Sequence, residues 1–182
     1  ELKNLIINIK ASAQNRPSAG KFRMSIDRNF SIPGAGRIVS GSVFSGEIYL
    51  GSSAMHLPSR SVIKVKDLRV QGMMAEVAKT GDRCALNISD NNLGRTTLSR
   101  GDWIVDSELD NLTNSAIVEV PTQLFEKKSR SIPLHFHLGS QHVTGKISRI
   151  KFQAPGRKQN FARVSLNKEI HTVRGDRFVI RD

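Results

Sequence analysis

FSIPGAGRIVSGSV, residues 30–43, packs three glycines into a short window. Glycine-rich loops bind phosphates in nucleotide-binding enzymes, and two patterns are typical of them. The dinucleotide pattern G-x-G-x-x-G fails because Val39 stands where the third glycine is required. The P-loop pattern G-x-x-x-x-G-K-[ST] is met from Gly36 to Gly41, but Ser42 takes the place of the lysine that would reach the phosphates. The stretch is therefore not a nucleotide-binding loop.

The residues that follow predict a strand instead of a helix. FSGEIYLG, residues 44–51, is strand-like, with Gly46 and Gly51 at turns. No helix N-terminus is then at hand to bind an anion. We interpret the glycines of residues 30–43 as positions for tight turns and close backbone packing at the start of a β-barrel.

Apolar and polar residues alternate on both sides of this stretch, which predicts an all-β fold. Residues 22–26 show the period of two that marks a strand. Further segments of strand character are 37–44, 61–71, 83–88, 103–105, 116–120, 131–138, 142–152, 161–166 and 177–180. Gly, Asn, Asp and Ser separate them at short intervals, as in antiparallel sandwiches and barrels. Both halves also set a Gly-Asp turn before an apolar strand, in RGDWIVD (100–106) and RGDRFVI (174–180), which favours two similar small antiparallel β-barrels in tandem.

The basic charge is the strongest signal in the composition. The 182 residues carry a net charge of +12, with 15 Lys/Arg against 9 Asp/Glu in residues 1–106 and 13 against 7 in residues 107–182. Because both halves share the excess, a polyanion such as nucleic acid is the first partner to consider, and a soluble basic protein without one is the alternative. No apolar run reaches the roughly 20 residues of a membrane span, and we find no signal peptide. A single cysteine, Cys84, fits a reducing cytosol.

Side chains with catalytic or metal-binding chemistry are few. His135, His137 and His142 could bind zinc, but no carboxylate or cysteine completes the set, so we interpret them as a histidine-bearing strand face. Cys84 lies in a predicted buried strand and is expected to act as a small apolar side chain. There is no Gly-x-Ser-x-Gly elbow. We expect no catalytic residue and no metal site in this chain.

Several segments resemble translational GTPases. FSIPGAGRIVSGSVFSGEIYLGS, residues 30–52, resembles F-x-I-x-G-x-G-T-V-V-T-G-x-x-x-x-G-x-I-x-x-G, the hallmark of the second domain of elongation factor Tu and its relatives. Arg37, Ile38 and Ser40 are mild departures from it. Segments similar to the selenocysteine-specific elongation factors are SIDRNF (25–30), TGDRCALNI (80–88), SRGDW (99–103), LHFHL (134–138) and HVTGKI (142–147). The resemblance covers almost everything from residue 21 to residue 182.

The resemblance implies a domain organisation. It implies the end of a G-domain helix and a linker in residues 1–20, a second-domain barrel in 21–106, a linker in 107–114, and a third-domain barrel in 115–182 that is truncated at its C-terminal end. The parent factor would be a GTPase with GTP and Mg²⁺ in a G domain upstream, whereas this fragment would be no enzyme and carry no cofactor.

The resemblance also implies partners. They are selenocysteinyl-tRNA and the ribosome, in the cytoplasm and without a membrane. A messenger-RNA hairpin would be bound only through a C-terminal region that this fragment lacks.

The positions that match the aminoacyl pocket of the family are Asp27, Arg28 and Arg83. A permanently charged guanidinium favours an anionic selenocysteine over a neutral serine, and Asp27 could orient one arginine or meet the α-amino group. Asp27 and Arg28 are neighbours, so both can line one pocket only if their strand ends or bulges there. Without the resemblance, an ion pair on the barrel surface is the simpler interpretation.

Basic residues of the second half are candidates for sequence-independent contacts with the tRNA backbone. They are Arg149, Lys151, Arg157, Lys158, Arg163 and Lys168. The segment QAPGRKQN, residues 153–160, could equally be a solvated hairpin, because a charge run without interleaved aromatic residues is a weak nucleic-acid signal.

Two other functions stay open. The chain could be the tRNA-binding barrels of another translational GTPase, such as a relative of initiation factors, although the set of Asp27, Arg28 and Arg83 argues against it. It could also be a stand-alone protein-interaction β-barrel that binds no RNA.

Overall fold

The computed structural model describes residues 20–34, 36–89, 97–121, 124, 131–150 and 160–181. Of the helix end and linker expected in residues 1–20, only residue 20 lies in this part of the chain. The chain divides into two compact units, with the boundary between Asp110 and Asn111. Both are built from antiparallel strands, as the alternation of apolar and polar residues predicts. Within the described residues, no helix is long and apolar enough to span a membrane.

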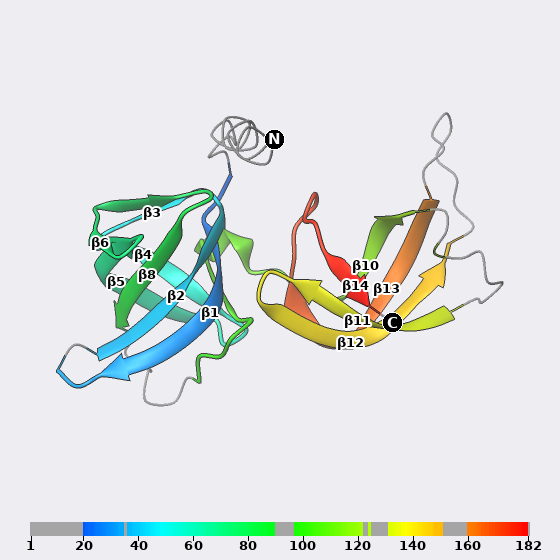
Figure 1. Cartoon of the computed structure of the whole chain (residues 1–182), viewed down its shortest axis with the longest axis horizontal. Coiled ribbons are helices and arrows are strands. Elements are labelled where there is room, and N and C mark those ends of the chain that lie inside the picture. The colour runs from blue at the N-terminus through cyan, green and yellow to red at the C-terminus, as the bar shows by residue number, and fades with distance from the viewer. Residues whose placement is uncertain are drawn as a thin grey trace, which may run out of the picture. The chain divides into compact units, whose positions relative to one another are not determined.

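The first unit is a closed β-barrel (Figure 1). Its elements are β1 (Arg23–Ile32), β2 (Gly36–Ser45), β3 (Glu47–Tyr49), β4 (Ser53–Leu57), β5 (Ser61–Val70), β6 (Met73–Met74), β7 (Val77–Lys79), β8 (Arg83–Ser89), β9 (Trp103–Val105) and the 3-10 helix η1 (Ser107–Leu109). Hydrogen-bonded pairing runs in the order β4-β9-β1-β2-β8-β5, and β5 pairs back with β4. Closure satisfies the strand edges that an open sheet would expose.

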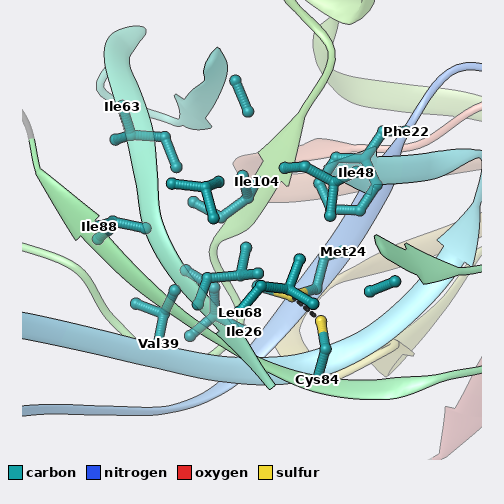
Figure 2. Packing of buried hydrophobic residues seen from close by; sticks show 14 of the residues in the cluster. Phe22, Met24, Ile26, Val39, Ile48, Ile63, Leu68, Cys84, Ile88 and Ile104 are labelled. Atoms are coloured by element: carbon teal, nitrogen blue, oxygen red, sulfur yellow. Dashed lines mark hydrogen bonds between the residues drawn. The ribbon is translucent and has the colours of Figure 1, made fainter. Parts of the chain in front are cut away.

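Alternation along the strands fills the barrel with apolar side chains. On β5, Ile63 and Val65 are buried whereas Val62 and Lys64 are exposed. Figure 2 shows side chains from several strands meeting in one core, among them Met24 of β1 and Cys84 of β8. The Cys84 thiol donates a hydrogen bond to the Met24 sulfur at 3.3 Å (Figure 2). Cys84 is a buried, free cysteine, which confirms the prediction that it packs as a small apolar side chain.

Gly41 allows the first two strands to approach closely. A Cβ atom at this position would lie 2.0 Å from the carbonyl oxygen of Ser25 on β1, far inside van der Waals contact. Gly34, between β1 and β2, has φ of +77°, a conformation that favours glycine. The glycines of residues 30–43 therefore serve a turn and a close backbone contact, as their failure to match the phosphate-binding patterns suggested.

A Gly-Asp turn recurs in both units. It spans residues 79–82, 99–102 and 173–176. In each turn an aspartate oxygen accepts a hydrogen bond from the first residue's N–H, at 2.7–2.9 Å. The aspartate N–H in turn donates to that residue's carbonyl, at 2.9–3.2 Å. The glycine has φ between +93° and +96°, which side chains disfavour. The repeated Gly-Asp sequence therefore forms a turn in each case, and the turn at 79–82 leads directly into β8.

The second unit is a five-stranded antiparallel sheet. Its described strands are β10 (Leu112–Val120), β11 (Ser131–Leu138), β12 (Gln141–Arg149), β13 (Asn160–His171) and β14 (Val179–Arg181). They pair in the order β10-β13-β12-β11-β14. Buried residues such as Leu134, Ile147 and Val164 alternate with exposed ones and form its apolar face. Residues 107–114, expected as a linker, contain η1 and the start of β10, because Leu112 already pairs with His171.

Candidate functional site

Asp27 and Arg83 form an ion pair on the outside of the first barrel. Arg83 Nη2 donates to Asp27 Oδ1 at 3.0 Å, and Arg83 Nη1 donates to Asp27 Oδ2, so the contact is bidentate. Ser40 Oγ also donates to Asp27 Oδ1, at 3.2 Å. β2, which carries Ser40, lies between β1 and β8. One carboxylate therefore links three neighbouring strands.

The ion pair fixes the charge of both partners. Partial burial acts to raise the pKa of Asp27, but the hydrogen bonds and charge of Arg83, together with Ser40 and Arg28, outweigh it and hold the pKa below its ordinary value. The pKa of Arg83 is raised, chiefly by its hydrogen bond to Asp27. At neutral pH the site holds a carboxylate and a guanidinium whose charges offset each other.

A β-bulge brings the neighbouring residue to the same place. Ile26 pairs with Gly41 and Arg28 pairs with Ser40, so Asp27 is an extra residue between two consecutive pairs. A regular strand would send Asp27 and Arg28 to opposite faces. The bulge removes that obstacle, and it lies where the missing side chain of Gly41 lets the β1 backbone come close.

Beside the bulge lies a shallow pocket of about 350 Å³. Its lining residues are Arg28, Phe30, Ser40, Arg69, Gln71, Gly72, Arg83, Cys84 and Ala85. Two of the three residues assigned from the sequence, Arg28 and Arg83, thus line one depression. The third, Asp27, is not among the lining residues but forms the bidentate ion pair with Arg83.

Arg69 lines the same pocket and was not predicted from the sequence. It lies on β5 and pairs with Ala85 of β8. Its nearest carboxylate is Asp67, with Nε to Oδ2 at 3.6 Å. No local pattern marks this residue, because its place beside the pocket depends on β5 pairing with β8.

Of the basic candidates in the second unit, the three that the structure describes lie at separate places on the sheet. Arg149 pairs with the buried Ala162 and so continues the inner face of the sheet beyond Ile147, although it is exposed. Arg163 is exposed and pairs with Ser148 on the opposite face. Lys168 is exposed further along β13. Lys151, Arg157 and Lys158 lie outside the described residues.

Three of the four histidines of the second unit, His135, His137 and His142, stack on its surface. The rings of His135 and His142 have centroids 5.0 Å apart, and those of His137 and His142 are 4.7 Å apart. His135 Nδ1 lies 2.7 Å from His142 Nε2. Among the described residues, no group of three His, Cys, Asp or Glu side chains has the arrangement of a metal site. This arrangement agrees with the predicted histidine-bearing strand face.

A buried histidine in the first unit has a structural task. His56 is inaccessible to solvent, its Nδ1 lies 2.6 Å from Ser59 Oγ, and its Nε2 lies 3.0 Å from Asp102 Oδ2. Asp102 closes the Gly-Asp turn before β9. The histidine therefore ties the end of β4 to that turn, and sequence patterns did not single it out.

Comparison with known proteins assigns both units to the same kind of protein. Residues 115–182 match the family described as selenocysteine-specific elongation factor, beta-barrel domain. The selenocysteine-specific elongation factor of Escherichia coli is 32% identical over 91% of this chain and 25% of its own length. The chain thus corresponds to a fragment of a selenocysteine-specific elongation factor. It spans about a quarter of the length of the curated relatives that it matches.

Solved structures of selenocysteine-specific elongation factors share the fold. The crystal structure of a bacterial one, EF-Sec, superposes with a TM-score of 0.79 and 25% identity, over 100% of this chain and 29% of that one. The factor SelB from Methanococcus maripaludis, solved in complex with the GTP analogue GPPNHP, superposes with a TM-score of 0.75 and 21% identity, over 98% of this chain and 43% of that one. The all-β prediction with barrels of the elongation factor Tu type is thereby confirmed.

Proposed function

We propose that this chain forms the tRNA-binding barrels of a selenocysteine-specific elongation factor, a GTP-dependent protein that binds selenocysteinyl-tRNA and delivers it to the ribosome. The observation that carries the proposal is the pocket beside the β1 bulge. Arg28 and Arg83 line it, and Asp27 holds Arg83 in a bidentate contact. The first barrel would take the aminoacyl end of the tRNA there.

The charge of the pocket suits selenocysteine better than serine. A selenol is more acidic than a thiol, whose pKa ordinarily lies near about 8.5, so selenocysteine is largely an anion at neutral pH. A serine side chain is neutral. Arginine stays charged and donates several hydrogen bonds in a fixed plane. Because Asp27 already offsets Arg83, the guanidinium of Arg28 supplies the excess positive charge that favours the selenolate. Asp27 would also receive the α-amino group.

The remaining functions of the factor would lie outside this chain. We place GTP, Mg²⁺ and GTP hydrolysis in a G domain that precedes residue 21, and the messenger-RNA hairpin site in a C-terminal region. Within this chain the proposed domains are residues 21–106 and 115–182, with no catalytic residue. The exposed Arg149 and Arg163 of the second unit would meet tRNA phosphates, as would Lys151, Arg157 and Lys158. The factor would act in the cytoplasm.

A comparison of two aminoacyl-tRNAs tests the proposal. Selenocysteinyl-tRNA and seryl-tRNA carry the two side chains that differ in charge, and binding of each is measured to the chain and to its Arg28→Ala and Arg83→Ala variants. Each substitution should weaken selenocysteinyl-tRNA binding by about tenfold or more and seryl-tRNA binding much less. Equal losses for both would contradict a role in recognising the amino acid.

The alternative functions make different predictions in the same measurement. Barrels of another translational GTPase would bind both aminoacyl-tRNAs with equal affinity. A protein-interaction module would bind neither, even at low salt, where contacts with phosphates are strongest. Any GTP turnover by the chain alone would contradict the placement of the nucleotide site outside it.

A further inference from the structure

A third arginine, Arg69, lines the pocket together with Arg28 and Arg83. Arg28 lies on β1 and Arg69 lies on β5, and the order β1-β2-β8-β5 puts two strands between them. Three strand spacings separate their backbones by about 14 Å. The two guanidiniums therefore reach the depression from strands that are not adjacent.

We propose that Arg69 binds a phosphodiester of the RNA end that carries the amino acid, while Arg28 and Arg83 face the amino acid itself. The proposal rests on the tRNA-binding function above. It adds a residue and a ligand chemistry, a nucleotide phosphate, to the same pocket.

Arg69 retains hydrogen-bonding capacity for such a ligand. Its guanidinium lies 3.6 Å from Asp67, beyond hydrogen-bonding distance, and 53% of the side chain is exposed. The other oxygen of Asp67 accepts a hydrogen bond from the Leu68 N–H. Arg83 differs, because Asp27 holds it in a bidentate contact. A planar guanidinium that is not engaged in this way is the group best suited to grip a phosphate with two hydrogen bonds.

A tight turn that follows Arg69 is hydrogen-bonded to β8. β5 and β6 are joined by Gln71 and Gly72, with φ of +52° and +86°, as in the tight two-residue turns of β-hairpins. The Gln71 N–H donates to the Arg83 carbonyl at 3.1 Å. The backbone that carries Arg69 is therefore fixed relative to the backbone that carries Arg83.

The neighbour of Arg69 favours a nucleotide over a bare anion. Met74 pairs with Arg69 across the hairpin, so both side chains stand on the same face. Met74 is 76% exposed, unusually so for an apolar side chain. A guanidinium beside an exposed thioether offers a phosphate contact next to an apolar surface for a ribose or base.

The test measures RNA binding by the chain and its Arg69→Gln variant. Three RNAs are used, namely selenocysteinyl-tRNA, seryl-tRNA and deacylated tRNA, at several salt concentrations. If Arg69 contacts a phosphate, the variant should bind all three RNAs about tenfold more weakly. The slope of log affinity against log salt concentration should also become shallower by about one. Arg69→Lys should restore the salt dependence but only part of the affinity, because lysine lacks the planar fork.

Lys66→Gln is the matched control, since Lys66 is an exposed cation on the same strand but lines a different depression with Arg37. Equal losses at residues 66 and 69 would mean general attraction to charge and would overturn the assignment. A loss confined to selenocysteinyl-tRNA would mean that Arg69 contacts the selenolate instead of a phosphate, and would overturn the assignment. Unchanged binding of all three RNAs by Arg69→Gln would overturn it as well. If the unsubstituted chain binds none of the RNAs, the proposed function itself fails; if it binds and Arg69→Gln matches it, only this inference fails.

Discussion

Asp27 and Arg83 are joined by a bidentate ion pair although β2 lies between their strands. Backbones two strands apart are about 10 Å distant, so the long side chain of Arg83 must span most of the gap. Two local features accompany the contact. The bulge in β1 releases Asp27 from the regular pairing, and a Gly-Asp turn directly precedes Arg83. The site is thus assembled from features that also shape the barrel.

The depressed pKa of Asp27 predicts a pH-dependent contribution to stability. Its ionised form is favoured in the fold, so the contribution is present above the ordinary pKa of 3.8 and is lost as the pH falls through the lower folded pKa. Asp27→Asn should lower the free energy of unfolding at pH 7 by about 1 kcal/mol or less, because half of Arg83 is exposed. Urea denaturation of both proteins between pH 7 and pH 2.5 checks this, and a difference that stays constant with pH would contradict it.

The close contact at Gly41 predicts a large cost for one added methyl group. Gly41→Ala would place Cβ 2.0 Å from the Ser25 oxygen, so β1 and β2 must separate next to the bulge. We expect a loss of about 3 kcal/mol in stability. Gly34→Ala is the matched control, because its φ is positive but no atom lies within 4 Å of the added Cβ, and it should cost about 1 kcal/mol. Equal thermal shifts for the two variants would show that the contact is not decisive.

Much of the fold could be predicted because its strands alternate. The segments predicted at 37–44, 61–71 and 83–88 correspond to β2, β5 and β8 within one or two residues. β4 was missed because SAMHL is buried at four successive positions and shows no alternation. β6 and β7 were missed because two or three residues are too short for any period. Register and barrel closure are long-range pairings that local patterns do not encode.

The candidate site, too, could be predicted only in part from the sequence. Asp27, Arg28 and Arg83 could be named only through the resemblance to elongation factors, since alternation alone would have separated Asp27 from Arg28. The resemblance pointed to no further arginine for this pocket, and Arg69 could be assigned to it only once the pairing of β5 with β8 was known. A local sequence window contains no information on which distant strand will lie alongside it.

Burial of Cys84 predicts that its thiol is unreactive in the native state. Desolvation raises the pKa of the thiol to about 12 from an ordinary 9.0, so its thiolate fraction at pH 8 is about a thousandfold smaller. Labelling by a thiol reagent should therefore be at least about a thousandfold slower than in urea-unfolded protein. Complete labelling within minutes without denaturant would show that the pocket exposes this sulfur.

The stacked histidines predict an acid-sensitive element in the second unit. Desolvation lowers the pKa of His137, and the charges of His142, Arg181 and His135 lower it further. Because the unfolded chain binds the proton more readily, stability should fall as the pH drops from the ordinary 6.5 to the lower folded pKa, and no further below it. NMR titration of the histidine ring protons should find His137 below 6.5. His142→Gln should raise that pKa more than Arg181→Gln does, since His142 has the larger effect. A pKa at or above 6.5, or no change in either variant, would contradict this account of the stack.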